Sequence, residues 1–229
     1  MVLGGSVMSN FFSKDHNNIP KYALKMTKQK GIRMRVTARG ELVVHANPFC
    51  TKEMIDKYVE RHLDEVYFKA KVPTVRLFGR SFQVKKIKGS TSHVTTCEDE
   101  LIIQAKDEAS MEKVFQQFLR ANAKDVLCDI SEMIFYRFQE YSITMPKVLI
   151  RKMTSSWGIC HPETNSITLN AELIHYPVEF IEYVVCHEFI HLLQPNHSPA
   201  FYDILKKVMP DYKRRIDLIE TNNEKQYLM

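Results

Sequence analysis

The chain has 229 residues, of which 45% are hydrophobic and 26% charged, and its formal net charge at pH 7 is +5. This balance is typical of a globular chain that builds one compact unit or two small ones. Only 7 residues are glycine, and no window reads GxGxxG, GxxxxGKS or GxxxxGKT, so the sequence does not support dinucleotide-binding or P-loop chemistry.

Cysteine usage and the start of the chain indicate the compartment. Five cysteines are an odd number, and none forms a CxxC pair, which favours free thiols in a reducing compartment. The segment 1–12 lacks a basic stretch followed by a sustained apolar core, and no apolar run is long enough to span a bilayer. We therefore expect a cytoplasmic protein without a membrane partner.

The positive charge is concentrated in the first part of the chain. Residues 1–150 hold 24 Lys+Arg against 17 Asp+Glu, whereas residues 151–229 hold 8 against 10. Two windows, 21–39 and 69–88, each contain seven basic and no acidic residues. Nucleic acid is one partner that such windows would attract, and a solvated strand face is the alternative interpretation.

The first half reads as a β-rich subdomain. Alternation over 32–38, the Arg39-Gly40 pair and the apolar run 42–44 predict a hairpin. Apolar residues at three- and four-residue steps from Met54 to Tyr67 predict a helix capped by Thr51 and ending before Pro73. Short runs at 75–78, 81–87, 93–97 and 101–104 predict further antiparallel strands.

The second half alternates helices and strands. A long apolar stripe over 111–138 predicts a helix that needs a sheet to pack on. Segments 148–153 and 166–169 predict strands flanking a turn at 161–165, and Pro177 opens another helix. We expect an α+β protein with a small antiparallel β-rich subdomain over residues 1–105, its first twenty residues flexible, and a second domain over residues 106–229.

The segment 186–198 reads CHEFIHLLQPNHS and contains the pattern HExxH followed by a third histidine. On a helix, His187 and His191 lie one turn apart on the same face, so both imidazoles can bind one metal ion. Glu188 is rotated by about 100° from His187 and is placed to act on a water molecule. The alternative is that these histidines are ordinary packed residues of an amphipathic helix.

The residues after this helix suggest how a third ligand reaches the ion. Pro195 disfavours helix at Gln194, and the turn-prone Pro195-Asn196 pair can bring His197 back toward the ion. Three histidines would hold one zinc ion and leave its fourth position to water. This predicts hydrolysis, with Glu188 as the general base and a protein or peptide as substrate.

Five segments in this order resemble the YgjP-like metallopeptidase family: SWGIC at 156–160, ITLN at 167–170, YVVCHEFIHL at 183–192, NHS at 196–198 and PDY at 210–212. The resemblance implies a zincin-like domain, related to SprT-like proteases, with an active-site helix that carries HExxH. It also implies zinc on His187, His191 and His197, with Glu188 catalytic. The family's usual Trp-Gly-Ser-Cys segment has Ile159 in place of the serine here.

Several residues near this pattern keep two interpretations. Trp157 is expected to be a core anchor rather than a substrate platform, and Cys160 and Cys186 are expected to be buried apolar residues rather than metal ligands. Tyr202 and Tyr212 follow the third histidine and either donate to an oxyanion or simply pack.

A zincin also needs a strand edge for extended substrate, and either 165–170 or the strand of Trp157 could supply it. Two further alternatives concern function. The chain could be a nucleic-acid-associated protease whose basic subdomain binds DNA, or a zinc-binding protein without turnover. The sequence indicates no oligomeric state.

Overall fold

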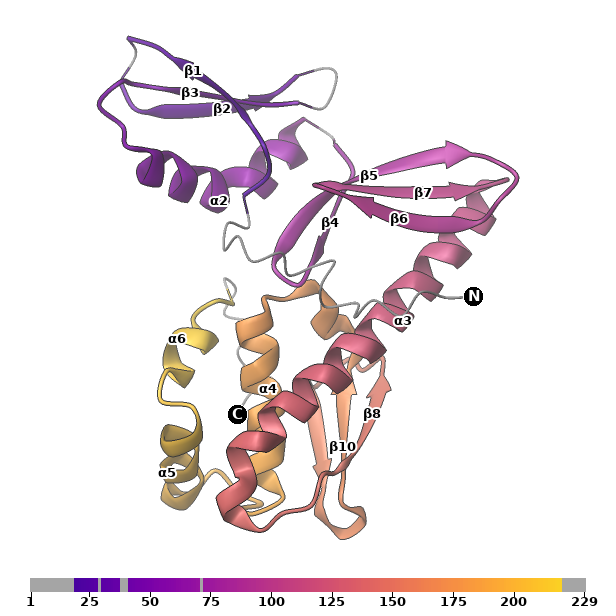
Figure 1. Ribbon diagram of the computed structural model, residues 1–229, viewed down its shortest axis with the longest axis vertical. Coiled ribbons are helices and arrows are strands. Elements are labelled where there is room, and N and C mark those ends of the chain that lie inside the picture. Colours follow the sequence, from indigo (N-terminus) through magenta and orange to yellow (C-terminus); the bar gives the residue numbers. More distant parts are fainter. Residues whose placement is uncertain (1–18, 29, 38–40, 71, 220–229) are drawn as a thin grey trace. The chain divides into compact units, whose positions relative to one another are not determined.

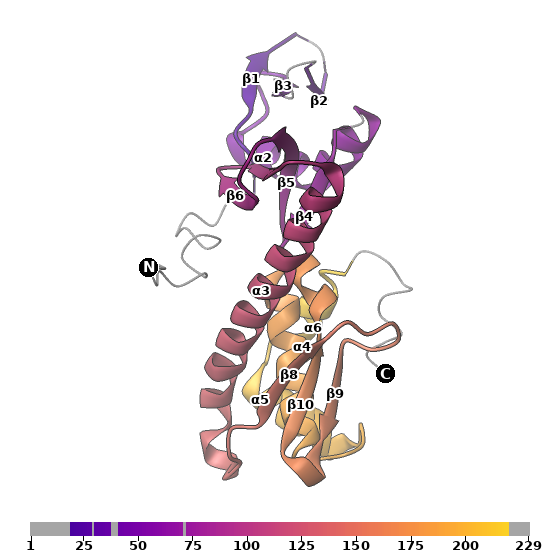
Figure 2. The ribbon, with the colours of Figure 1, turned by 90° about the vertical axis from the view of Figure 1, so that its right-hand side faces the viewer.

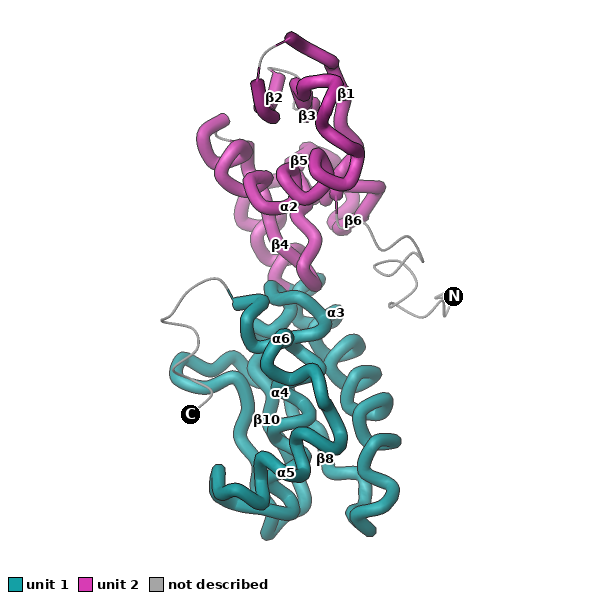
Figure 3. The backbone as a smooth tube through the Cα atoms, turned by 90° about the vertical axis from the view of Figure 1, so that its left-hand side faces the viewer, with its two compact units in different colours: residues 1–13, 117–229 teal, residues 14–116 magenta. Residues whose placement is uncertain are grey.

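The computed structural model describes residues 19–28, 30–37, 41–70 and 72–219. It divides them into two compact units, unit 2 within residues 14–116 and unit 1 within residues 117–229 (Figure 3). The division falls inside a long helix, later in the chain than the expected boundary at residue 105. The expected Arg39-Gly40 turn and most of the expected flexible start lie outside the described residues.

Unit 2 begins with a three-stranded sheet in the order β1-β3-β2. Strands β2 (Ile32–Val36) and β3 (Leu42–Ala46) form the predicted antiparallel hairpin, whereas β1 (Ala23–Met26) was not predicted and pairs parallel with β3. Helix α2 (Lys52–Lys69) begins at Thr51, whose side chain accepts a hydrogen bond from Met54 N at 3.3 Å as predicted. Apolar side chains of α2 and of β3 form one core cluster, which contains Leu42, Val44, Ala46, Ile55, Val59, Leu63 and Tyr67.

The second sheet of unit 2 contains β4 (Thr74–Leu77), β5 (Arg80–Lys88), β6 (His93–Cys97) and β7 (Glu100–Ala105) in the order β4-β5-β7-β6. The four strands occur where the sequence predicted them, but the sheet is mixed rather than wholly antiparallel, since β5 pairs parallel with β7. Residues Leu101, Ile103 and Ala105 of β7 are buried, which explains why β7 takes the inner position and β6 the edge.

Unit 1 contains most of α3 (Glu108–Phe135), which continues into the 3₁₀ helix η1 (Tyr136–Tyr141), and a three-stranded sheet in the order β8-β10-β9 (Figures 1 and 2). Strand β8 (Lys147–Arg151) pairs parallel with β10 (Ser166–Asn170). The predicted turn is the 3₁₀ helix η2 (Pro162–Thr164), but it joins β10 to a third strand, β9 (Gly158–His161). Strand β9 begins directly after Trp157, where the sequence predicted a strand without defined bounds.

The remaining helices follow β10: η3 (Ala171–His175), α4 (Val178–His191), α5 (Pro199–Val208) and α6 (Tyr212–Ile216). Helix α4 begins after Pro177, as predicted, and is buried along almost its whole length. The ring of Phe189 contacts Phe135 of α3 and Phe138 of η1, with centroids 6.4 and 5.5 Å apart. No helix among the described residues is long and apolar enough to cross a membrane.

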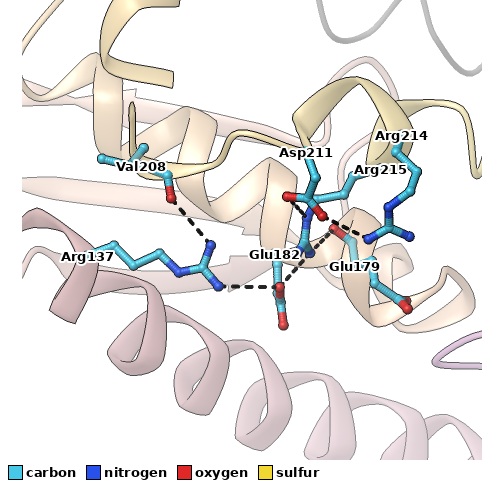
Figure 4. A network of polar contacts seen from close by, with 7 residues as sticks. All are labelled: Arg137, Glu179, Glu182, Val208, Asp211, Arg214 and Arg215. Atoms are coloured by element: carbon cyan, nitrogen blue, oxygen red, sulfur yellow. Dashed lines mark hydrogen bonds and ion pairs between the residues drawn. The ribbon is translucent and has the colours of Figure 1, made fainter. Parts of the chain in front are cut away.

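A buried polar network fastens α6 to the first half of α4 (Figure 4). The Arg215 guanidinium donates to Glu182 at 2.5 Å, to Asp211 at 3.0 Å and to the backbone carbonyl of Glu179 at 3.2 Å. The hydrogen bonds from Arg215 and Arg214 lower the pKa of Asp211 to about 2. Because Arg215 is buried, this network fixes the helix from which the candidate site is built.

Candidate metal centre

The three histidines singled out in the sequence come together at the end of α4. The Nε2 atom of His187 lies 3.1 Å from Nε2 of His191 and 2.9 Å from Nε2 of His197. Three nitrogens bound to one tetrahedral zinc at about 2.0–2.1 Å would be roughly 3.3 Å apart. Among the described residues, this trio is the one group of His, Cys, Asp or Glu side chains whose ligand atoms lie close enough together to hold a metal ion. The donor set and its spacing therefore fit a zinc ion.

Each ring of the helical pair has a partner on its second nitrogen. His191 Nδ1 lies 3.0 Å from the backbone carbonyl of Gln194, an acceptor that requires the proton to sit on Nδ1. The hydroxyl of Tyr183, one turn earlier on α4, lies 3.5 Å from His187 Nδ1. The first contact leaves the Nε2 lone pair of His191 free to bind metal, as is usual for metal-binding histidines.

The turn after α4 delivers His197. Helix α4 ends at His191, and the backbone N–H groups of Leu193 and Gln194 both donate to the Ile190 carbonyl, at 2.9 and 2.8 Å. Ser198 is the N-cap residue of α5 but does not cap the helix with its side chain; its hydroxyl accepts a hydrogen bond from Gln194 Nε2 at 3.1 Å. Gln194 thus stabilises the turn twice, through its backbone N–H to Ile190 and through its side chain to Ser198.

Phe201 forms an apolar wall behind all three imidazoles. Its ring centroid lies 4.9, 5.0 and 4.8 Å from those of His187, His191 and His197, and the side chain is fully buried. Sequence reasoning missed this role of Phe201, and also the contact of Tyr183. The signal for Phe201 was its place four residues after His197, within the first turn of α5.

The imidazoles of His187 and His191 favour the neutral form that binds metal. Burial, followed by the neighbouring His191 and His197, lowers the pKa of His187 to about 3. Burial also lowers the pKa of His191, against the opposing effect of the Gln194 carbonyl. His197 is exposed, so the cluster reaches the surface on its side. A metal ion would not have to displace protons from His187 at neutral pH.

Glu188, which follows His187 on α4, is buried with 6% of its surface exposed. Burial raises the pKa of its carboxyl to about 8. Gly158 of β9 lies against it: a Cβ atom added at this glycine would be 2.5 Å from Cγ and from Oε1 of Glu188. The Glu188 side chain therefore occupies the space that a side chain at position 158 would need.

The other residues singled out in the sequence lie outside the histidine trio. Trp157 is buried and packs edge-on against Tyr176, with centroids 4.6 Å apart, as expected of a core anchor. Cys186 is fully buried, as expected, whereas Cys160 is only half-buried. Burial, followed by the charge of Glu188, raises the pKa of Cys160 to about 12. Tyr212 is buried and Tyr202 is 41% exposed. Neither cysteine belongs to the metal-binding cluster.

The sheet offers one strand edge next to Glu188. Strand β10 has neighbours on both sides, so it cannot take up another strand, whereas β9 is an outer strand. Asn170 N donates to the Trp157 carbonyl at 2.9 Å, and antiparallel residues alternate in the direction of their backbone groups. Ile159 and His161 therefore face β10, and Gly158 and Cys160 turn their N–H and C=O groups outward.

A family model described as "YgjP-like, metallopeptidase domain" matches residues 30–222. No curated protein matches. Among solved structures, the crystal structure of the metallopeptidase zymogen of Pyrococcus abyssi abylysin is similar over 42% of this chain and 89% of that chain, with 25% sequence identity and a TM-score of 0.33.

Proposed function

Because the chain belongs to the YgjP-like metallopeptidase domain family, we propose that it is a zinc-dependent peptidase in which His187, His191 and His197 hold one zinc ion. The observation that carries this proposal is the convergence of three imidazole Nε2 atoms, with the buried Glu188 following His187 on α4. When bound, zinc supplies a Lewis acid that activates water and stabilises negative charge on a peptide carbonyl oxygen.

Glu188 is the general base in this proposal. Its carboxylate accepts the proton of the attacking water and returns it to the leaving amine. A pKa near the working pH suits both halves of this task, and burial provides such a pKa before any ion is bound. Gly158 supports this role of Glu188, because a residue with a side chain at 158 would displace the carboxylate.

The substrate in this proposal is an extended peptide paired with β9. The outward N–H and C=O groups of Gly158 and Cys160 supply the hydrogen bonds, as in other cases of strand addition. Such contacts are independent of side chains and would accept many sequences. An unfolded or partly unfolded protein is therefore the expected substrate.

Metal content and cleavage of an unfolded protein, measured together, test the proposal. Purified protein should carry about one zinc per chain, and His191→Ala should lose it while remaining folded. Glu188→Gln should keep the zinc and lose cleavage. Folded wild-type protein that does not bind zinc would contradict the metal site, and equal cleavage by Glu188→Gln and wild type would contradict the role of the base. Zinc binding without any cleavage would indicate the non-catalytic alternative.

A second candidate function is binding of nucleic acid by unit 2. Cross-strand pairing places Lys25, His45 and Arg33 in one row on the same face of the β1-β3-β2 sheet. Arg35 stands on this face two residues beyond Arg33. No ion pair involves Lys25, Arg33 or Arg35 within the described part of the chain, so this row is available to phosphates.

The second basic window gives less support, because most of its described cations have carboxylate partners. Arg76 pairs with Asp64, Lys85 with Glu100 at 2.5 Å, and Lys86 with Glu108. We expect Arg33→Glu combined with Arg35→Glu to weaken the binding of a DNA oligonucleotide at low salt, while Lys85→Glu leaves it unchanged. Binding that does not weaken as salt rises, or that responds equally to both variants, would contradict this second function.

A further inference from the structure

A groove of about 500 Å³ lies between α3 and β8 in unit 1. Figure 2 shows these two elements side by side, on the side of the sheet opposite to β9. Its floor is apolar and its rim is basic: the lining consists of Val148, Leu149, Ile150 and Ala171, with Cys128, Arg120, Lys124, Arg151 and Lys152. The groove contains neither the histidine trio nor Glu188.

The charges on the rim have one sign. Arg120 and Lys124 are four residues apart on α3 and therefore point along the same face. Lys152 pairs with Glu172 at 2.9 Å, whereas no carboxylate among the described residues pairs with Arg120, Lys124 or Arg151. No acidic side chain lines the groove. It therefore favours an anionic occupant.

The backbone of β8 adds a second kind of recognition. Lys147 N donates to the Asn165 carbonyl at 2.9 Å, so Lys147 directs its backbone groups toward β10. Alternate residues of a parallel strand turn to opposite sides, which leaves the N–H and C=O groups of Val148 and Ile150 on the outer edge. Unpaired edge groups of this kind accept an additional strand.

We propose that an extended acidic peptide segment of a partner protein binds in this groove as an additional strand along β8. Its backbone pairs with Val148 and Ile150, and its carboxylates meet Arg120, Lys124 and Arg151. Every second residue of a strand advances about 6.6 Å, close to the roughly 6 Å between Arg120 and Lys124 along α3. The best ligand thus alternates acidic with apolar residues, the latter resting on the floor.

This inference goes beyond the proposed peptidase function and does not depend on it. Strands β8 and β9 are opposite edges of one sheet, separated by β10. Binding at β8 requires neither zinc nor Glu188. The full-length Glu188→Gln protein is therefore the right protein for the test, since it would not cut the probe.

The probe is a fluorescent peptide of nine alternating Glu and Val residues, with both ends blocked, and the readout is its Kd from fluorescence anisotropy. We expect Arg120→Glu combined with Lys124→Glu to raise Kd at least about tenfold, through the loss of two charge pairs. The matched control reverses two exposed cations elsewhere in unit 1, Lys206 and Lys213, and should leave Kd within about twofold.

A second probe separates strand pairing from charge. The same peptide with N-methyl groups on every second residue, tested in both registers, keeps its carboxylates but cannot pair along β8 on the methylated side. One of the two registers should lose binding. The proposal is overturned if both methylated peptides bind as well as the parent, if the control variant weakens binding as much as the groove variant, or if a decathymidine oligonucleotide binds in the groove and the peptide does not.

Discussion

The side chain of Glu188 of α4 lies where a Cβ atom would stand if residue 158 of β9 were not glycine. A Cβ at position 158 would lie 2.5 Å from Cγ and Oε1 of Glu188 and 2.6 Å from its Cδ. The backbone of Gly158 is not in the positive-φ region, unlike that of Gly31 and Gly79. Glycine is therefore required at 158 for space and not for backbone conformation.

The first prediction follows from this contact. Gly158→Ala should displace the Glu188 carboxylate and reduce peptide cleavage at least about tenfold, while the histidine trio still binds zinc. Overpacking should also cost about 1–3 kcal/mol of the free energy of unfolding. Urea denaturation and zinc titration measure the two effects separately from activity.

Two controls make this prediction specific. Gly89→Ala meets only the flexible side chain of Gln104 in unit 2 and should leave activity unchanged. In a Glu188→Ala background the added methyl group has room, so Gly158→Ala should cost little further stability. A stability cost that is the same in both backgrounds would show that the contact with Glu188 is not its cause.

The second prediction concerns pH and the metal-free protein. The pKa of Glu188 is about 8 in the folded protein and near 4.5 in an unfolded chain. The raised pKa therefore has no effect on the free energy of unfolding below about pH 4.5. As pH rises from there toward 8, it destabilises the fold progressively, because ionisation is favoured only in the unfolded chain. In the presence of a chelator, Glu188→Gln should be more stable than wild type by about 1–3 kcal/mol at pH 7 and equally stable at pH 4.

Denaturation by urea at several pH values checks this, and the change of His187 protonation cancels because it occurs in both proteins. A Glu188→Gln variant that is less stable than wild type at pH 7 without metal would mean that the carboxylate has favourable partners. Zinc should reduce the difference, since a nearby cation favours the ionised carboxylate.

The sequence predicted the parts of the site that depend on local geometry. His187 and His191 are one helical turn apart, and this spacing alone places them on one face of α4. The position of His197 followed from the turn at Pro195. Phe201, Gly158 and the choice of β9 as the free edge could not be predicted in this way. Each depends on a contact between different segments of the chain, and the periodicity of apolar residues within one helix or strand does not predict such contacts.

Strand direction had the same limitation. Alternation of apolar and polar residues is equal in parallel and antiparallel strands, so the hairpin of β2 and β3 was predicted and the parallel pairing of β5 with β7 was not. Strand β9 has only four residues, and its last one, His161, falls in the predicted turn 161–165, so the sequence did not define the bounds of this strand. The sequence therefore offered two candidate edges for the proposed substrate, 165–170 and the strand of Trp157, with nothing to choose between them.

The third prediction tests the loop between β8 and β9. Asn170 is buried, and its Nδ2 donates to the carbonyls of Met153 and Ser156 at 3.0 and 2.9 Å, while its Oδ1 accepts from Met153 N and Glu172 N at 3.2 and 3.1 Å. Asn170→Asp keeps the acceptor but sets a carboxylate against two carbonyls. It should destabilise the fold by about 2–3 kcal/mol.

Hydrogen exchange of residues 152–158 provides the local readout, which should rise in Asn170→Asp. The exposed Asn196 provides the control, since Asn196→Asp should change neither exchange nor stability. Unchanged exchange in Asn170→Asp would mean that other contacts hold the loop.

The fourth prediction concerns the network around α4. Arg215 is 9% exposed and bonds Glu182, Asp211 and the Glu179 carbonyl, so Arg215→Met leaves the Glu182 carboxylate poorly paired in a buried position. The free energy of unfolding should fall by about 3 kcal/mol. Arg214→Met is the matched control, because Arg214 is exposed and, among the described residues, bonds only Asp211. It should cost less than about 1 kcal/mol. Adding Glu182→Gln to Arg215→Met should recover part of the loss, since it removes the unpaired charge. If Arg214→Met and Arg215→Met cost the same in urea denaturation, the network does not hold α6 against the helix that carries His187 and His191.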